Sequence, residues 1–428
     1  MASLEAEAGY AVPGFSYWQL DDDETTPELK WPLNVAVYDT MRRQDAQVIS
    51  VLRAVTLPIR RTEWRIDQNG ASDEVAQFVA ENLNLPLAGV ARTAPPARTR
   101  DRFSWQEHLR LALLMLPFGH SFFEQTYRYQ GGRYHLRKLG WRPPRTIKHI
   151  EVAADGGLVA IEQDGVGAKR ARMGVDRLVA YVNDREGGNW LGASLLRPAY
   201  KYWILKDRVL RLQAQTLDRN GMGVPVYKSP EPPERLHGDE LEAWQRKEID
   251  SGLKLARSFR SGNQAGASIA NTASVELLGV KGTLPDADKP IRYYDEQIAR
   301  AVLAHFLNLG TETGSWALGS TFAEFFTLSL QTVANQIADV ATQHIVEDLV
   351  DINFGPEVPA PRVVFDEIGS RHPVTAEAIR ALIDCGALTA DDDLETYIRT
   401  VYGLPELDPS TARERTTKET ENASQTAG

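Results

Sequence analysis

The feature that most constrains the fold is residues 192–219, GASLLRPAYKYWILKDRVLRLQAQTLDR. Its spacing predicts one long helix that begins near Ser194, whose hydroxyl can cap the first turn, and ends before Asn220. At about 100° per residue, four basic residues share one face of this helix; we call this face the basic stripe, Arg197, Lys201, Arg208 and Arg211. Apolar residues lie on both sides of the stripe, which favours a helix with neighbours on both flanks.

Two interpretations of this helix stay open at the level of pattern. A helix packed on both flanks, with one basic face left over, suits a wall of helices that lines a wet surface. A half-buried core helix whose arginines and lysines are merely solvated explains the same pattern.

Composition limits the class of protein. The 428 residues are 43% hydrophobic and 25% charged, which suffices for two or three ordinary domains. Because no apolar run approaches the ~18 residues of a membrane span and residues 1–10 lack the order of a signal peptide, we expect an intracellular soluble protein. Cys385 is the only cysteine, so neither an intrachain disulfide nor a cysteine-based zinc site is expected.

The charge balance bears on nucleic-acid binding. A net charge of −10 argues against a dedicated sequence-reading DNA-binding protein. Residues 197–260 are nevertheless basic on balance. An acidic protein with a local basic track is compatible with transient, non-specific contact to a polyanion.

The first half of the chain predicts helices followed by strands. Residues 1–40 show no sustained period and are expected to form an irregular arm. Helices are predicted around one short strand at 62–67, and their ranges are 38–57, 73–83 and 105–116. The period then changes to about two, which predicts strands at 120–129, 133–139, 146–152, 158–163 and 178–182. Helices followed by an antiparallel meander make an α+β domain.

In the second half of the chain, predicted strands and helices alternate. A strand at 223–228, a helix at 239–259 and a strand at 268–278 predict a small α/β insertion. A helix at 295–309, a glycine-punctuated loop at 310–320 and one very long helix at 321–354 follow. The chain is expected to finish with a strand at 362–365, helices at 375–385 and 391–401, and a polar, disordered tail from 408.

Chemical motifs are missing from the sequence. No phosphate-binding loop, dinucleotide-binding fingerprint, zinc-protease motif or hydrolase nucleophile elbow occurs. His344 with Glu347 and Asp348 is interpreted as solvated helix charge, and residues 391–393 as acids at a helix N-terminus. We therefore predict no catalytic residue, no metal site and no cofactor.

Four stretches, in their order, resemble phage portal proteins of the Mu-like type. They are GWRPPRTI (140–147), YVNDREGGNWLGASLLRPAYKYWILKDRVLRLQA (181–214), DRNGMGVPV (218–226) and GALTADDDLETYIRTVYGLPE (386–406). The resemblance implies a structural ring without enzymatic activity, usually a dodecamer, at one vertex of the capsid. Double-stranded DNA would pass through this ring during packaging and ejection.

The resemblance also implies an α+β portal fold assembled as a ring. Its expected parts are an N-terminal arm (1–40), a wing (41–193), a first stem helix (194–220), a clip (221–289), a second stem helix (290–309), a tunnel loop (310–320), a long helix (321–355), a mostly helical crown (356–407) and a disordered tail (408–428).

The resemblance further implies sites and partners. The tunnel-loop candidates are Thr311, Thr313, Ser315 and Trp316, and the basic stripe supplies the channel-lining candidates. The candidates for contact with the motor or adaptor are Arg246, Lys247, Lys254 and Arg257. The implied partners are other copies of the chain, non-specific double-stranded DNA, the terminase large subunit, a head–tail adaptor, and the major capsid and scaffolding proteins, with no membrane. The expected location is the virion, after assembly in the host cytoplasm.

Two alternatives belong to other classes of function. One is a nucleic-acid-processing enzyme whose active-site carboxylates the motif search does not reveal. The other is an adaptor protein of a phage head that forms no channel.

Overall fold

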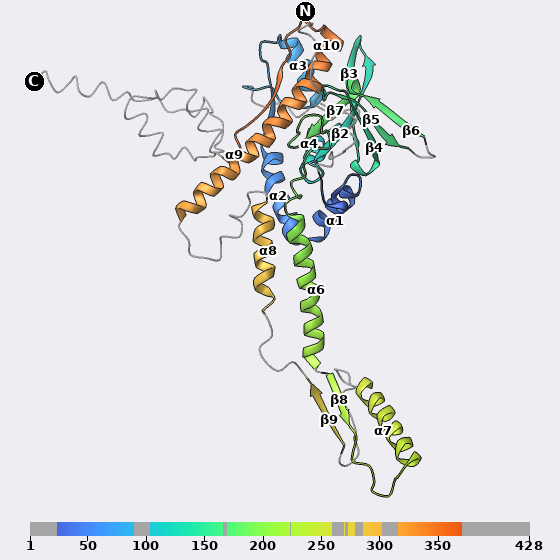
Figure 1. Ribbon diagram of the computed structural model, residues 1–428. Coiled ribbons are helices and arrows are strands. Elements are labelled where there is room, and N and C mark those ends of the chain that lie inside the picture. Colours follow the sequence, from blue (N-terminus) through green and yellow to red (C-terminus); the bar gives the residue numbers. More distant parts are fainter. Residues whose placement is uncertain are drawn as a thin grey trace, which may run out of the picture. The chain divides into compact units, whose positions relative to one another are not determined.

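Figure 1 shows the computed structural model, which describes residues 24–89, 103–165, 169–222, 224–258, 269, 273–278, 286–301 and 316–369. The chain divides between Ile368 and Gly369 into two compact units, and nearly all described residues belong to the first. The helices expected at 375–385 and 391–401 and the tail from 408 lie outside the described residues.

The irregular arm expected at residues 1–40 is wrong in its last part, which is helical. After the short η1 (Pro27–Leu29), α1 spans Leu33–Gln44 and α2 spans Ala46–Arg61. Helix therefore begins inside the stretch expected to be irregular, and the single helix expected at 38–57 is two. The break is at Asp45, whose carboxylate accepts hydrogen bonds from the backbone N–H groups of Gln47 (2.8 Å) and Val48 (3.0 Å). Such an N-cap stabilises a new helix start.

Two three-stranded antiparallel sheets follow α4 (Trp105–Ala112) and α5 (Met115–Phe118). Their strands are β2 (His120–Gln130), β3 (Arg133–Arg142), β4 (Ile147–Val152), β5 (Leu158–Asp164), β6 (Arg170–Gly174) and β7 (Leu178–Val182), with the 3-10 turns η2 (Pro144–Thr146) and η4 (Val175–Arg177).

The strand orders are β3-β2-β7 and β4-β5-β6. The single meander expected from the sequence is therefore wrong in two places: β3 and β4 belong to different sheets, and β7 returns to pair with β2. The sequence also missed β6, because Met173 is its one buried side chain and RARMG has no apolar alternation.

A two-stranded sheet joins distant parts of the chain. Strand β1 (Trp64–Asp67), which α3 (Asp73–Leu83) follows, pairs antiparallel with β10 (Arg362–Phe365). Val363 of β10 is buried in the largest hydrophobic cluster. The crown expected from residue 356 is thus corrected: the chain through Ile368 packs into the first unit.

The longest helix is continuous from Trp316 to Phe354. It consists of α9 (Trp316–Ala341), one π-helical turn, η6 (Thr342–Val346), and α10 (Glu347–Phe354). The loop expected at 310–320 is corrected in its last five residues, which are helical. One glycine inside a helix costs only about 1 kcal/mol relative to alanine, so Gly319 does not end it.

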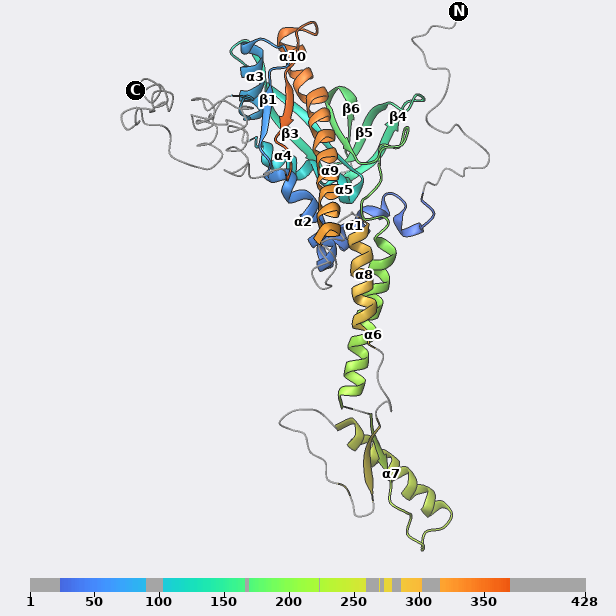
Figure 2. The same ribbon diagram turned by 90° about the vertical axis from the view of Figure 1, so that its left-hand side faces the viewer.

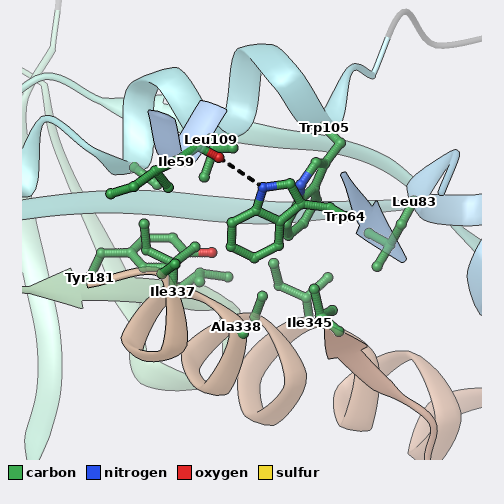
Figure 3. Close-up of a cluster of buried hydrophobic side chains, with 14 of the residues drawn as sticks. Ile59, Trp64, Leu83, Trp105, Leu109, Tyr181, Ile337, Ala338 and Ile345 are labelled. Carbon is green, nitrogen blue, oxygen red and sulfur yellow. Dashed lines mark hydrogen bonds between the residues drawn. The ribbon is translucent and has the colours of Figure 1, made fainter. Parts of the chain in front are cut away.

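The core forms where this long helix meets β1, α4 and β7. In Figure 3, the Trp64 indole lies over Ile337, Ala338 and Ile345, and its N–H donates to the Ile59 carbonyl oxygen at 3.1 Å. Burying each large apolar side chain of such a cluster stabilises the fold by about 1.5–3 kcal/mol. The first unit therefore has an ordinary hydrophobic core to which other elements can be fixed.

Helices α6 (Tyr200–Met222) and α8 (Asp288–Arg300) lie side by side (Figures 1 and 2). Helix α6 begins six residues later than expected. The turn from Ser194 is held by the Leu196 N–H on the Ser194 hydroxyl (3.1 Å), but Pro198 has no N–H to continue an α-helical ladder. Helix α8 starts before the expected residues 290 and 295, and residues 302–309 lie outside the described residues.

Between these helices in the chain, β8 (Val224–Lys228) pairs antiparallel with β9 (Ser274–Leu278). Helix α7 (Asp239–Ser258) packs on β8. This small α/β insertion is confirmed. Among the described residues, no helix is long and apolar enough to cross a membrane.

Candidate nucleic-acid interface

The basic stripe lies on the exposed side of α6 and of the turn that precedes it. Lys201, Arg208 and Arg211 are exposed. Arg197 forms a two-pronged ion pair with Glu24, with one guanidinium nitrogen 2.9 Å from Oε1 and Nε on Oε2. Burial alone would raise the pKa of the Glu24 carboxyl, but the hydrogen bonds from Arg197 and Thr26 and the charge of Arg197 together outweigh burial and lower that pKa.

Neighbouring groups on α6 also contact other residues of the basic stripe. Arg211 Nε lies 2.7 Å from the Asp207 carboxylate, and Lys201 Nζ lies 5.9 Å from the centre of the Tyr202 ring. Arg208 is exposed. Two of the four cations thus share their charge with a carboxylate, which weakens the attraction of the stripe for a polyanion.

Lys206 is the residue of α6 that the sequence reasoning missed. It is only 7% exposed, on the opposite side of the helix from the stripe at 100° per residue. Its Nζ lies 2.9 Å from Asp45 Oδ2 and 2.6 Å from Asp295 Oδ1. Burial alone would lower the pKa of Lys206, and hydrogen bonds with Asp295 and Asp45 outweigh it and raise the pKa. The sequence did contain a signal for this buried lysine, because Lys206 stands among apolar residues on one side of the predicted helix.

Large apolar side chains are exposed on α6, α7 and α8. Leu217 of α6 is 62% exposed and Ile249 of α7 is 66% exposed. Other exposed apolar or aromatic side chains of these three helices are Ile204, Leu210, Leu212, Leu253 and Tyr293. We call this set the uncovered apolar set. The set is spread over α6, α7 and α8.

The insertion packs through a close contact between α7 and β8. The Tyr227 hydroxyl donates to Glu248 Oε2 at 2.9 Å, and a Cβ added at Gly252 would meet the Tyr227 ring at 2.1 Å. Ile249 and Leu253 of α7 are exposed, and Gly252 and Glu248 face the strand instead.

The four clip candidates are all exposed on α7: Arg246, Lys247, Lys254 and Arg257. Arg246 lies 3.4 Å from Glu242, one helical turn away. Of the tunnel-loop candidates, Thr311, Thr313 and Ser315 lie outside the described residues, and Trp316 is the first residue of α9. In the described part of the chain, no cluster of acidic, histidine or cysteine side chains could hold a metal ion.

The described architecture is thus an α+β unit from which two paired helices lead into a small α/β insertion. Residues 35–404 match the family described as portal protein of Mu bacteriophage. The chain belongs to this portal protein family.

Two solved structures with a TM-score above 0.5 share the fold. The chain resembles a component of the native gene transfer agent virion with a TM-score of 0.53 at 13% identity, and 88% of this chain and 95% of the other are covered. A component of the native gene transfer agent neck computed with C12 symmetry gives 0.53 at 12% identity, with the same coverage. An HK97 family phage portal protein from Corynebacterium diphtheriae gives 0.41 at 15% identity, covering 75% and 93%.

Proposed function

We propose that copies of this chain form a ring at one vertex of a capsid, through which double-stranded DNA is packaged and ejected. Membership of the portal family supports this proposal. The observation that carries it is the uncovered apolar set, because one subunit alone leaves these side chains in water. Neighbouring subunits in a closed ring would cover them, since a ring repeats one heterologous contact until it closes. The C12 symmetry of the gene transfer agent neck makes twelve copies the expected number.

We propose the parts of the subunit from the bounds of the described elements. We assign the wing to residues 24–199 together with 316–368, and the stem to α6 and α8. Residues 223–285 form the clip, residues 302–315 the tunnel loop, and residues from 369 the crown. The N-terminal helices and the long C-terminal helix thus share one wing core.

The sites are proposed on the same basis. Lys201 and Arg208 are the best candidates to contact passing DNA, because they are exposed and form no ion pair with a carboxylate within the described part of the chain. Thr311, Thr313 and Ser315 would contact DNA from the tunnel loop, and Trp316 would do so from the start of α9. The four cations of α7 would dock a terminase motor and later a tail adaptor, through exposed charges suited to transient contact.

No chemical step is assigned to the subunit. Portal proteins are structural, and a separate terminase would hydrolyse the ATP that drives packaging. Capsid and scaffolding proteins would meet the wing, and the proposed location is the portal vertex of the virion.

Electron microscopy of the purified protein tests the proposal. Rings with a central hole near the ~20 Å width of duplex DNA are expected, and Leu212→Ser with Leu217→Ser should break them into smaller particles. Leu57→Ser is the matched control, because Leu57 is a similarly exposed leucine on α2. Strictly monomeric particles of the parent at high concentration would contradict the proposal.

A further inference from the structure

The carboxylate of Glu24 holds the guanidinium group of Arg197, although 173 residues separate them in the chain. Glu24 Oε1 accepts from a terminal guanidinium nitrogen of Arg197 at 2.9 Å, and Oε2 accepts from Arg197 Nε. Oε1 also accepts from the Thr26 N–H at 2.8 Å, which fixes the carboxylate from its other side. A two-pronged, charge-assisted pair of this kind is stronger than a hydrogen bond between neutral groups.

The segment that carries Glu24 is anchored independently of this ion pair. Leu29 of η1 is only 2% exposed. Its neighbours in one buried cluster include Leu196 and Ala199 of the turn before α6 and Ile298 of α8. We call residues 24–29 the N-terminal strap. Because Leu29 is buried beside the turn that contains Arg197, the strap keeps a carboxylate at a high local concentration next to this arginine.

The other paired cation of the basic stripe has a weaker partner. Arg211 pairs with Asp207 one turn away on its own helix, and these side chains are 76% and 51% exposed. Exposed pairs of this type contribute little, because water screens them. The side chains of Arg197 and Glu24 are 41% and 20% exposed. Of the two pairs, the one with Glu24 therefore compensates its cation more fully.

A phosphate group of duplex DNA would need the same donors of Arg197. Arginine binds carboxylates and phosphates alike through two parallel N–H groups. Glu24 occupies this pair of donors, with one of its oxygens on each of two guanidinium nitrogens. A phosphate can therefore take the two-pronged position only after the Glu24 carboxylate has moved away.

We propose that Glu24 is an internal substitute for a DNA phosphate on Arg197, so that the N-terminal strap withholds this cation of the basic stripe from the duplex. The inference rests on the proposed function, in which the stripe contacts passing DNA. Lys201 and Arg208 then make the basal contacts, and displacement of the strap adds one cation per subunit. A channel wall with fewer free cations binds DNA less tightly, which favours sliding.

Binding of a fluorescent DNA duplex to the full-length protein, titrated at several salt concentrations, tests the proposal. Glu24→Gln keeps the size of the side chain and removes its charge, so the donors of Arg197 become available to phosphate. The affinity should rise by about threefold or more at low salt, and its salt dependence should steepen by about 0.9 log units for each Arg197 that reaches a phosphate. Arg197→Gln in the Glu24→Gln background should remove this gain.

Glu107→Gln is the matched control. It removes the same charge and frees Arg110, an arginine of α4 that lies outside the basic stripe. The affinity for the duplex and its salt dependence should stay at the parent values. An equal gain in Glu107→Gln and Glu24→Gln would overturn the proposal, because net charge alone would then explain it.

Arginine-selective dicarbonyl labelling, measured peptide by peptide by mass spectrometry, gives a readout that needs no DNA. In Glu24→Gln, Arg197 should react about threefold faster than in the parent or more, because its two donors lose their charged partner. Arg170 and Arg177, whose side chains are exposed elsewhere, are internal references and should not change. Added duplex should then protect Arg197 more strongly in Glu24→Gln than in the parent.

A further variant separates failure of this inference from failure of the proposed function. If Lys201→Gln with Arg208→Gln binds the duplex more weakly than the parent, while Glu24→Gln changes neither affinity nor labelling, the stripe contacts DNA and the inference about Glu24 is overturned. If Lys201→Gln with Arg208→Gln binds the duplex as tightly as the parent does, the stripe is not the DNA contact, and the proposed function fails at this site together with the inference.

Discussion

The Lys206 ammonium group on α6 lies 2.9 Å from the carboxylate of Asp45, the N-cap of α2, although 161 residues separate them in the chain. Asp295 of α8 binds the same ammonium group at 2.6 Å. Asp45 also caps α2 through Gln47 and Val48. One buried cation thus fixes α6 and α8 to the start of α2.

Replacing Lys206 should destabilise this junction. Lys206→Met removes the cation from two carboxylates and should lower the free energy of unfolding by about 3–5 kcal/mol, the usual cost of breaking a buried ion pair. Chemical denaturation measures the change. Lys201→Met, on the exposed side of the same helix, should stay within about 0.5 kcal/mol of the parent.

The Lys206 contribution should also depend on pH in a defined direction. The folded pKa is raised above 10.5, so the stabilisation is complete below pH 10.5 and is lost as the pH rises through the folded pKa. The difference between the parent and Lys206→Met should therefore shrink only above about pH 10.5. A difference that already falls between pH 7 and 9 would argue against the ion pairs.

The basic stripe should affect DNA and not assembly. Changing Arg197, Lys201, Arg208 and Arg211 to Gln should weaken non-specific duplex binding by purified rings and reduce its salt dependence, because each phosphate contact releases a counterion. The same four changes at Arg246, Lys247, Lys254 and Arg257 are the control and should leave DNA in the channel unaffected. If the stripe variant fails to form rings, the stripe makes lateral ion pairs.

Gly252 should be required for the packing of α7 on β8. A methyl group there would overlap the Tyr227 ring, so Gly252→Ala should cost about 1–3 kcal/mol through overpacking. Hydrogen exchange should become faster in α7 and β8 and stay unchanged in β1. Ser251→Ala, at the exposed neighbouring position, should leave exchange at its parent rate. Parent-like exchange in Gly252→Ala would show that the tyrosine moves aside freely.

Two buried histidines should make the first unit of the chain sensitive to acid. Burial lowers the pKa of His108 to about 3 and that of His120 to about 4. Both are neutral when folded and take up a proton near pH 6.5 when unfolded, so stability is lost as the pH falls from about 6.5 towards 4. Each contributes up to about 1.4 kcal/mol per pH unit to the slope.

Denaturation between pH 7 and 4 measures this slope. His120→Gln should remove about half of the histidine contribution, whereas His149→Gln, at an exposed position, should leave the slope intact. An unchanged slope in His120→Gln would mean that other groups control the acid response.

Local pattern was sufficient for much of the fold. The helix at Asp73–Leu83 and the first pair of long strands follow from periods of 3.6 and two, and from turn residues such as Gly131 and Gly132. Where two local signals competed, the sequence reasoning failed. Asp45 is both a plausible helix residue and a strong cap, and only the packing of α1 against α2 selects the cap.

The sequence by itself determined the α+β class, the basic stripe and the order of elements, because these depend on side chains close together in the chain. The tertiary structure decided the pairing of β1 with β10, the return of β7 to β2 and the partners of Lys206. These contacts join residues far apart in the chain, and their free energy depends on burial and on the charge opposite. A one-dimensional pattern contains neither quantity, so the chain had to fold before they were defined.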